Sequence, residues 1–236
     1  MPKASLSAWA QRLLDTESMP LLPSGARRLV PERLKHDVRL RALSVGLGVI
    51  PPRAMHSDEE AALLAGLAAS ARRVVEIGVY EGGSAVRIVR DMPADGELHL
   101  IDPFGTQPGA LPHDWAATEW ATRRTVARAA RGGAHVVWHP VRSDEAVRGW
   151  SAPIDLLFVD GDHLEPGVRS DWDLWHPHVR PGGAVAFHDS RLGRGDGRGL
   201  PGPTAVVEQL FRAGAVPGWS IAAEVDRTTV VRRDRP

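Results

Sequence analysis

Acidic and histidine side chains follow two apolar runs of this chain, residues 154–159 and 184–187. They are Asp160, Asp162, His163, His188 and Asp189. If the two runs are adjacent parallel strands, their carboxyl ends meet at one edge of a sheet and these side chains come together. Close carboxylates need a cation or protons to offset their repulsion, and oxygen-rich donors suit Mg²⁺, Ca²⁺ or Mn²⁺ better than zinc. The pattern predicts a divalent-cation site or, without a metal, carboxyl groups with raised pKa values.

A glycine-rich segment follows an earlier β-branched run, residues 74–77. Gly78 and Gly82 would allow positive φ angles and a close approach of the backbone to a ligand. Ser84 is in a position to cap the helix that follows. A turn of this kind indicates a nucleotide-binding α/β protein, but by itself it would also suit a dinucleotide.

Two carboxylates near this turn narrow the choice of ligand. Glu76 lies within the strand end, where it would repel a pyrophosphate but can accept hydrogen bonds from an amine or a cation. Asp102 ends the next expected strand, where a carboxylate can accept both hydroxyls of a ribose. S-adenosylmethionine (SAM) carries an ammonium, a sulfonium and a ribose but no phosphate. The two acids therefore favour SAM as the cofactor over NAD.

The segments Glu76-x-Gly78-x-x-x-Gly82-x-Ser84 and Leu100-Ile101-Asp102 resemble motifs I and II of class I SAM-dependent methyltransferases. The resemblance implies that the glycine turn holds the methionine part of SAM and that Asp102 holds its ribose. Ser143 follows the third expected strand, where this family contacts adenine, although its role can also be a helix cap alone. Asp160 would border the same cofactor site.

A longer stretch, residues 159–189, is similar to a subgroup that includes macrolide sugar O-methyltransferases and cephalosporin-biosynthesis relatives. The resemblance implies that Asp160 and Asp189 bind Mg²⁺ and that His163 is the general base. His188 departs from the subgroup, which has an acidic residue there. It would act as a third metal ligand or would only orient Asp189 through a hydrogen bond.

Together, the predicted cofactor and cation sites indicate methyl transfer from SAM to a hydroxyl of a small molecule. A sugar or a glycosylated natural product is the expected acceptor. A divalent cation would lower the pKa of that hydroxyl. His163, whose unperturbed pKa is near 6.5, would then take the proton. Asp162 is a candidate partner for this base.

Other aromatic and basic residues carry weaker predictions. Trp115 and Trp120, with His113, either line an acceptor pocket or pack against a helix. Trp172 and Trp175 are expected in the core, because they are three residues apart on a helix. Two arginines of a glycine-rich loop, Arg194 and Arg198, are expected to be solvated rather than to bind an anionic acceptor.

Strands and helices alternate along most of the chain, which predicts an α/β fold with a Rossmann-like, doubly wound and mostly parallel seven-stranded sheet and an antiparallel C-terminal hairpin. The expected strands cover residues 74–77, 97–101, 134–138, 154–159, 184–187, 219–224 and 228–231. The expected helices cover residues 61–71, 84–90, 118–131, 143–150 and 166–176. Loops over residues 103–114 and 191–203 follow strand ends and are candidates for lids.

The first 55 residues form an expected helical appendage to a methyltransferase domain over residues 56–236. Short helices are expected over residues 7–14, capped by Ser7, and over residues 31–45, ended by Gly46, Gly48 and the following prolines. Ser57 and Glu60 resemble a capping box at the start of the next helix. The appendage would cover a site, pack on the domain or contact another copy in a homo-oligomer.

Composition excludes several classes of function. The chain has 29 Lys+Arg and 29 Asp+Glu, so it lacks the basic excess of general nucleic-acid binders. It has no cysteine, which excludes thiolate catalysis and Cys-based zinc sites. With no apolar segment long enough to span a membrane, a cytoplasmic location is expected. Two alternatives stay open from sequence, an NAD-linked oxidoreductase and a protein that binds SAM or S-adenosylhomocysteine (SAH) without catalysis.

Overall fold

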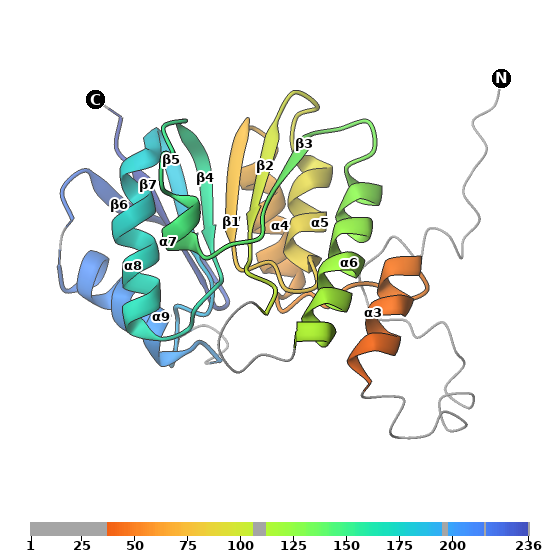
Figure 1. The fold of residues 1–236 in the computed structure, drawn as a ribbon. Helices are drawn as coiled ribbons and strands as arrows, with labels where there is room; N and C mark the ends of the chain where they lie inside the picture. Colours follow the sequence, from red (N-terminus) through yellow and green to blue (C-terminus); the bar gives the residue numbers. More distant parts are fainter. Residues whose placement is uncertain (1–36, 106–111, 195–197, 215, 236) are drawn as a thin grey trace.

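One mixed sheet organises the chain (Figure 1). The computed structural model describes residues 37–105, 112–194, 198–214 and 216–235, and of residues 112–117 the backbone alone. Within them, seven strands lie in the order β3-β2-β1-β4-β5-β7-β6. They are β1 Arg73–Ile77, β2 Glu97–Ile101, β3 His135–His139, β4 Ile154–Val159, β5 Val179–Phe187, β6 Trp219–Val225 and β7 Thr228–Arg233. The first five are parallel, and β7 is antiparallel to both β5 and β6, as the sequence predicts.

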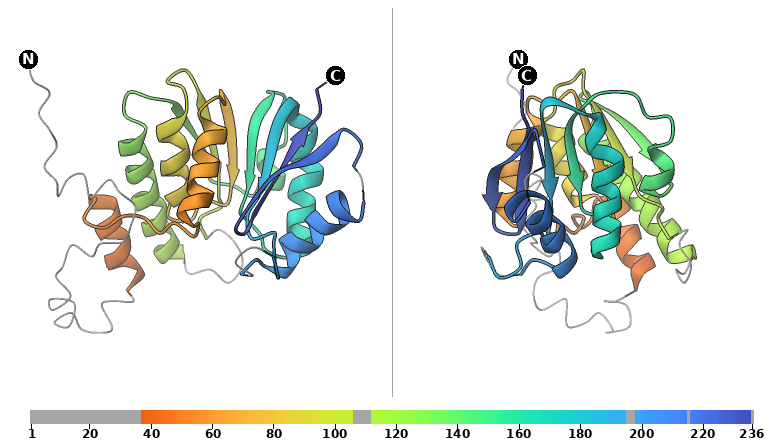
Figure 2. Two further views of the ribbon diagram at one scale, coloured as in Figure 1. Left: turned by 180° about the vertical axis from the view of Figure 1, so that it is seen from behind. Right: turned by 90° about the vertical axis from the view of Figure 1, so that its left-hand side faces the viewer.

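Helices cover both faces of this sheet, as the two views of Figure 2 show. They are α3 Val38–Leu47, α4 Asp58–Ala68, α5 Gly83–Asp91, α6 Pro112–Ala129, α7 Ser143–Ala146, α8 Glu165–Trp175 and α9 Pro201–Val207. One core contains α4, α5 and α6 with sheet residues such as Leu98 and Phe158, and the other contains α8 and α9 with Leu157 and Phe187. Because the central strands are buried on both faces, most of their residues are apolar, although Glu76 lies within β1 and Asp155 within β4.

The expected elements are confirmed with a few corrections at their ends. The helix after β3 stops at Ala146 rather than at residue 150, and α6 begins at Pro112, inside the loop expected over residues 103–114. Helix α9 and the π-helical segment Glu208–Arg212 that continues it were not predicted from the sequence. Prolines on either side of Gly202 conceal this helix in the sequence, yet proline is well tolerated in a first helical turn.

The described part of the appendage packs on α6. Asp37 caps α3, and Gly48 ends it in the left-handed conformation, whereas Gly46 lies inside the helix, contrary to the prediction. The side chain of Arg128 donates hydrogen bonds to the carbonyls of Val45 and Gly46 at the end of α3. The helix expected over residues 7–14 lies outside the described residues.

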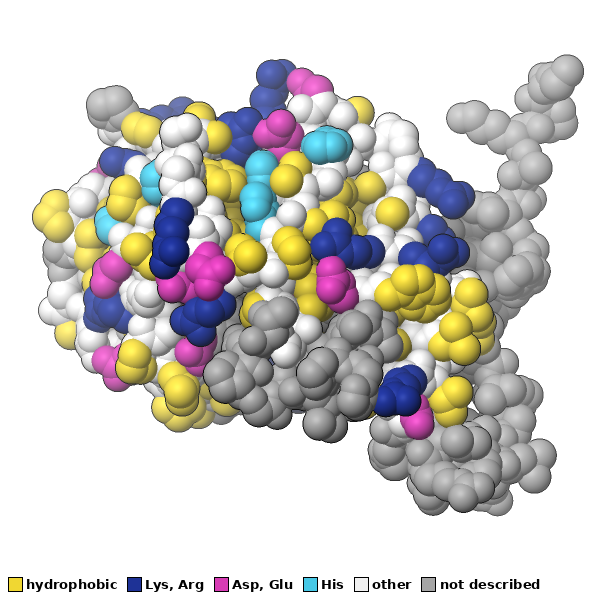
Figure 3. Space-filling model, viewed as in Figure 1, with side chains coloured by type: hydrophobic (Ala, Val, Ile, Leu, Met, Phe, Trp, Pro, Cys, Tyr) yellow, Lys and Arg dark blue, Asp and Glu magenta, His cyan; other side chains and the backbone are white. Residues whose placement is uncertain are grey.

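Helix α3 carries several exposed apolar side chains. Val38, Leu40, Leu43 and Leu47 are between 41% and 58% exposed, and Figure 3 shows hydrophobic side chains gathered over this part of the molecule. The domain boundary at residue 55 and the use of this segment as a lid or oligomer contact stay predictions. Among the described residues, no helix combines the length and apolar character needed to cross a bilayer. The cytoplasmic location also stays a prediction.

Candidate active site

A cleft of about 1140 Å³ lies at the carboxyl ends of β1, β2, β4 and β5. Small-molecule sites in proteins commonly occupy ~300–1,000 Å³, so this cleft has room for two ligands side by side. Most of the predicted site residues line it, namely Gly78, Ser84, Asp102, Ser143, Asp160, His163, His188 and Asp189. Glu76 and Gly82 do not line it, and the Glu76 side chain is fully buried beneath the glycine turn.

The glycine turn between β1 and α5 depends on the absence of side chains. Gly78 has a φ of 87°, and a Cβ atom there would collide with the backbone of Asp160 on the neighbouring strand end. Gly82 has a φ of 81° and is itself the N-cap of α5. The prediction that Ser84 caps this helix is therefore wrong. Its hydroxyl instead donates a hydrogen bond to Oε1 of Glu76, because a fully buried carboxylate competes strongly for a nearby donor.

Glu76 has one oxygen without a partner. Within the described part of the chain, Oε2 accepts no hydrogen bond although it is buried. Burial, together with the charges of Asp160 and Asp102, raises the pKa of Glu76 well above its usual value. A buried, unsatisfied acceptor of this kind is costly unless a ligand supplies a donor.

Asp102 holds the glycine turn from the end of β2. Its Oδ2 accepts hydrogen bonds from the backbone amides of Val79 and Tyr80, both at 2.9 Å, and its Oδ1 accepts one from Phe104 at 2.8 Å. A carboxylate has about four acceptor positions, so capacity for a ligand hydroxyl remains. The ribose-binding role of Asp102 stays a prediction, and its structural role in holding the turn was not predicted.

Ser143 at the start of α7 is paired with an acid of the next helix. Its hydroxyl donates to Oδ1 of Asp171 in α8, and both residues line the cleft. Burial raises the pKa of Asp171 to about 6. The helix-cap role of Ser143 is wrong, since the N-cap of α7 is Arg142 and no side chain caps it.

The acidic and histidine residues that follow β4 and β5 do come together. One donor atom from each of Asp160, His163, His188 and Asp189 lies within 4.8 Å of the others. Asp189 adopts a φ of 51°, an uncommon conformation for a residue other than glycine, and such outliers gather at functional sites. Asp162 is separate from this group, because its Oδ1 accepts the amide of Leu164 at the start of α8. Its expected role as a partner of His163 is not seen.

His163 is the accessible member of this cluster, with 42% of its side chain exposed. Its Nε2 lies 3.6 Å from Oδ1 of Asp160 and 3.5 Å from Oδ2 of Asp189. The neighbouring Asp160 raises the pKa of His163 above its usual 6.5, against the effect of partial burial.

His188, by contrast, is buried and contacts Asp160 directly. Its Nδ1 lies 2.8 Å from Oδ1 of Asp160 but 3.6 Å from Oδ2 of Asp189. The alternative that His188 only orients Asp189 by hydrogen bonding is therefore wrong. Burial opposes charge on this imidazole, but Asp160 and Glu60 raise the pKa of His188 to about 10. Burial also disfavours charge on Asp160, yet His163, His188 and His56 hold its pKa well below the usual range.

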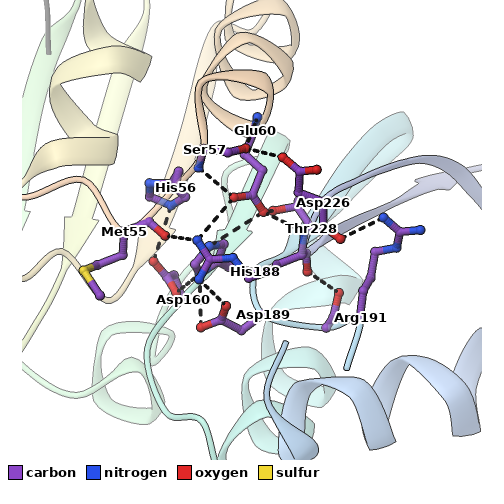
Figure 4. Close-up of polar contacts among 12 residues, drawn as sticks. Met55, His56, Ser57, Glu60, Asp160, His188, Asp189, Arg191, Asp226 and Thr228 are labelled. Carbon is purple, nitrogen blue, oxygen red and sulfur yellow. Dashed lines mark hydrogen bonds and ion pairs between the residues drawn. The ribbon is translucent and has the colours of Figure 1, made fainter. Parts of the chain in front are cut away.

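Three further residues of this site were missed from the sequence (Figure 4). Nε2 of His56 lies 3.6 Å from Oδ2 of Asp160, Oε1 of Glu60 lies 3.8 Å from Nε2 of His188, and Arg227 donates to Oδ1 of Asp189 at 3.2 Å. They come from the segment before α4, from α4 and from the β6–β7 turn. Only the capping box marks Glu60 in the sequence, and it is confirmed, with both of its hydrogen bonds present.

The structure tests some of the predictions for the tryptophans and the loop arginines. Trp120 packs against Gly46 of α3 rather than into the cleft, and Trp172 and Trp175 are buried core residues as expected. Arg194 forms an ion pair with Glu208. The side chains of residues 113 and 115 lie outside the described part of the chain.

Comparisons with solved structures establish the fold. The O-methyltransferase TomG of Streptomyces achromogenes, solved in complex with SAM, is 24% identical, with a TM-score of 0.58 over 89% of this chain and 94% of that one. An O-methyltransferase from Bacillus cereus, solved with SAH, is 16% identical, with a TM-score of 0.51 over 88% of this chain and 94% of that one. The chain therefore has the fold of these SAM- and SAH-bound O-methyltransferases.

Sequence comparisons agree with this fold. A family described as a methyltransferase domain matches residues 75–190 of this chain. A putative O-methyltransferase from Mycobacterium sp. (strain JLS) is 29% identical over 82% of this chain and 78% of that protein. Uncharacterized protein R132 of Acanthamoeba polyphaga mimivirus is 33% identical over 57 residues, 24% of this chain and 26% of that protein. The methyltransferase match decides against the NAD-linked alternative.

Proposed function

We propose that this enzyme transfers the methyl group of SAM to a hydroxyl of a small molecule, a sugar or glycosylated natural product, with help from a divalent cation and with His163 as the general base. The observation that carries the proposal is the group of Asp160, His163, His188 and Asp189 within one cleft with the glycine turn. Relatives named as O-methyltransferases support a hydroxyl acceptor.

The residues around the glycine turn suit SAM. The unpartnered Oε2 of Glu76 is an acceptor for an ammonium, and Gly78 and Gly82 leave the turn free of side chains. The remaining acceptor capacity of Asp102 suits the ribose, and Ser143 lies where the adenine is expected. Asp160 lies between this part of the cleft and the cation site. When bound, SAM supplies a methyl group on a sulfonium, which is already a good leaving group.

The cluster also suits a divalent cation. Its donor atoms lie 2.8 to 3.6 Å apart in the closest pairs and within 4.8 Å overall, and they include two carboxylates. Asp160, His188 and Asp189 would hold the ion, because their side chains are the more buried members. A bound cation would lower the pKa of the acceptor hydroxyl and fix its orientation.

His163 would be the general base that takes the proton of the acceptor hydroxyl. It reaches the same point as the metal-binding side chains but is exposed to the cleft, as a group that meets the acceptor must be. As the acceptor oxygen forms its bond to the methyl carbon, the carbon–sulfur bond breaks and SAH is left. The hydroxyl proton goes to Nε2 of His163, which must therefore be neutral at the start.

Thermal unfolding of the full-length chain tests the proposal. SAH should raise the melting temperature of the wild type, because a ligand that binds the native state stabilises it by mass action. A divalent cation should add a further shift that is lost in Asp160→Ala and kept in Asp173→Ala, an exposed acid on α8. Absence of any SAH effect at millimolar concentration would contradict the proposal. SAH binding without SAH release from SAM, tested with a panel of sugars and glycosides, would instead favour a non-catalytic SAM-binding protein.

A further inference from the structure

A buried carboxylate approaches His188 from the side away from the cleft. Glu60 is 0% exposed, and its Oε1 lies 3.8 Å from Nε2 of His188, an atom without a hydrogen-bond partner in the described residues. Three donors already converge on Glu60, namely the amides of Ser57 and Arg227 and the hydroxyl of Thr228, at 2.8 to 3.1 Å. A carboxylate surrounded in this way is an acceptor, so the ring nitrogen that faces it carries a hydrogen.

The other ring nitrogen of His188 faces the cation site. Nδ1 is the atom that lies 2.8 Å from Asp160 and 3.6 Å from Asp189. Without a metal ion, Nδ1 donates its hydrogen to the carboxylate of Asp160. A bound metal ion would replace that hydrogen, and the neutral ring would keep its hydrogen on Nε2. Metal-binding histidines commonly have this arrangement, in which a carboxylate holds the far nitrogen and fixes the ring as a ligand.

We propose that His188, oriented by Glu60, makes this site selective for a divalent first-row transition metal of the Mn²⁺ or Fe²⁺ kind over Mg²⁺. The inference rests on the proposed cation site. Mg²⁺ prefers oxygen ligands and near-ideal octahedral geometry, whereas imidazole suits Fe²⁺ and the later first-row metals, and Mn²⁺ is intermediate between the two groups. The resemblance to sugar O-methyltransferases implies an acidic residue at this position, so the histidine is a departure of this chain.

The local charges agree with a divalent ion. Around a neutral His188, the described side chains supply the carboxylates of Asp160, Asp189 and Glu60, while Arg227 is the guanidinium in contact with two of them. Once a metal ion has replaced the hydrogen on Nδ1 of His188, the charge of the ion would offset this excess of negative charge. The imidazoles of His56 and His163 also lie beside Asp160, each with Nε2 at 3.6 Å from one of its carboxylate oxygens.

Metal binding to EDTA-treated, full-length protein tests this selectivity without a need for the acceptor. Mn²⁺ binding is measured from the electron paramagnetic resonance (EPR) signal of the free ion, and Mg²⁺ is titrated as a competitor. The wild type should prefer Mn²⁺, and His188→Asp should reduce the ratio of the Mg²⁺ to the Mn²⁺ dissociation constant by about tenfold or more. Pulsed EPR of bound Mn²⁺ should show coupling to an imidazole nitrogen in the wild type and in His163→Asn, so it still tests the proposal if His188→Asp does not fold.

A second pair of variants tests the role of Glu60 as a positioning residue. Glu60→Gln should weaken Mn²⁺ binding by about 10- to 100-fold, the usual effect of losing a carboxylate behind a metal-binding histidine. Ser57→Ala is the matched control, because it removes the capping hydroxyl from the same helix end but no group that faces His188. Its Mn²⁺ affinity should remain within a factor of about two of the wild type.

The possible results bear separately on the metal selectivity, on the cation site and on the proposed methyltransferase function. The selectivity proposal is supported if bound Mn²⁺ shows nitrogen coupling in the wild type and if the ratio of the Mg²⁺ to the Mn²⁺ dissociation constant falls in His188→Asp. Mn²⁺ bound without nitrogen coupling, an unchanged ratio in His188→Asp, or equal effects of Glu60→Gln and Ser57→Ala would overturn it. Failure to bind either cation while SAH still stabilises the protein removes the cation site and this inference but keeps the methyltransferase. Loss of SAH binding as well would contradict the proposed function itself.

Discussion

Arg41 of α3 and Glu81 of the glycine turn form a two-pronged ion pair, with Nε and Nη2 of the arginine 2.6 and 2.7 Å from the two carboxylate oxygens. Glu81 is only 7% exposed and also accepts the backbone amide of Arg53 at 2.7 Å. The appendage is therefore fastened to the loop that is expected to hold the methionine part of SAM. Parallel hydrogen bonds of this kind fix geometry as well as charge.

Breaking this pair should weaken both stability and cofactor binding. Arg41→Ala should lower the free energy of unfolding by about 2 kcal/mol, because it removes two charge-assisted hydrogen bonds from a nearly buried carboxylate. It should also reduce the thermal shift that SAH produces. Arg72→Ala is the control, since its partner Asp95 is exposed and surface pairs contribute about 0–1 kcal/mol. Equal losses in the two variants would contradict the prediction.

Gly78→Ala should be far more damaging than Gly132→Ala. Both glycines have positive φ angles, 87° and 74°, so both substitutions carry the same backbone cost of about 1 kcal/mol. Only at Gly78 would the new Cβ collide with backbone, that of Asp160, whereas nothing lies within 4 Å at Gly132. Chemical denaturation and SAH titration should show that Gly132→Ala folds and binds SAH, while Gly78→Ala loses SAH binding. SAH affinity that is unaffected in Gly78→Ala would rule out the glycine turn as the cofactor site.

Asp171→Asn should stabilise the protein at neutral pH but not in acid. The folded-state pKa of Asp171 is about 6, above its unfolded value of 3.8, so the native state binds the extra proton. The stability from this carboxyl is present below about pH 4 and is lost as pH rises through 6. The advantage of the variant should grow over that range by about 2–3 kcal/mol, since one pKa unit corresponds to 1.36 kcal/mol.

Melting temperatures measured from pH 4 to pH 8 check this difference. Asp173→Asn, an exposed acid on the same helix, should track the wild type at every pH. A constant offset between Asp171→Asn and the wild type would show that the carboxyl titrates normally in the folded state.

His163→Gln should separate catalysis from binding. Loss of a general base commonly reduces the rate by about 10²- to 10⁴-fold, and His163 is not expected to hold SAM. SAH release from SAM should fall by that factor, measured with an acceptor found in the sugar and glycoside panel. The SAH-induced thermal shift should stay within error of the wild type. A rate within a factor of about three of the wild type would exclude His163 as the base.

The sequence by itself determined the sheet and the chemical character of its edge. Runs such as residues 97–101 and 154–159 coincide with strands to the residue, because most of their side chains are apolar and buried, and their polar residues fall at half-buried positions. Parallel connectivity then requires that Asp160 and Asp189 end neighbouring strands on the same side. The glycine turn and Asp102 are local motifs, so their resemblance to methyltransferases was visible without a fold.

The tertiary structure alone decided which partner each polar side chain has. Ser84 pairs with Glu76 instead of capping α5, Ser143 pairs with Asp171, and His188 faces Asp160 rather than Asp189. Hydrogen-bond partners depend on burial and on side-chain directions across elements, which a linear spacing does not specify.

The buried acid Glu60 is the clearest example of a contact that the sequence does not specify. It lies about a hundred residues from Asp160 in the chain, on a helix that the sequence marks only by its capping box, and it meets His188 because α4 packs beside the β6–β7 turn. Contacts between distant segments arise from packing, so the sequence predicted a cation site at the sheet edge, but only the fold placed a buried carboxylate behind its histidine.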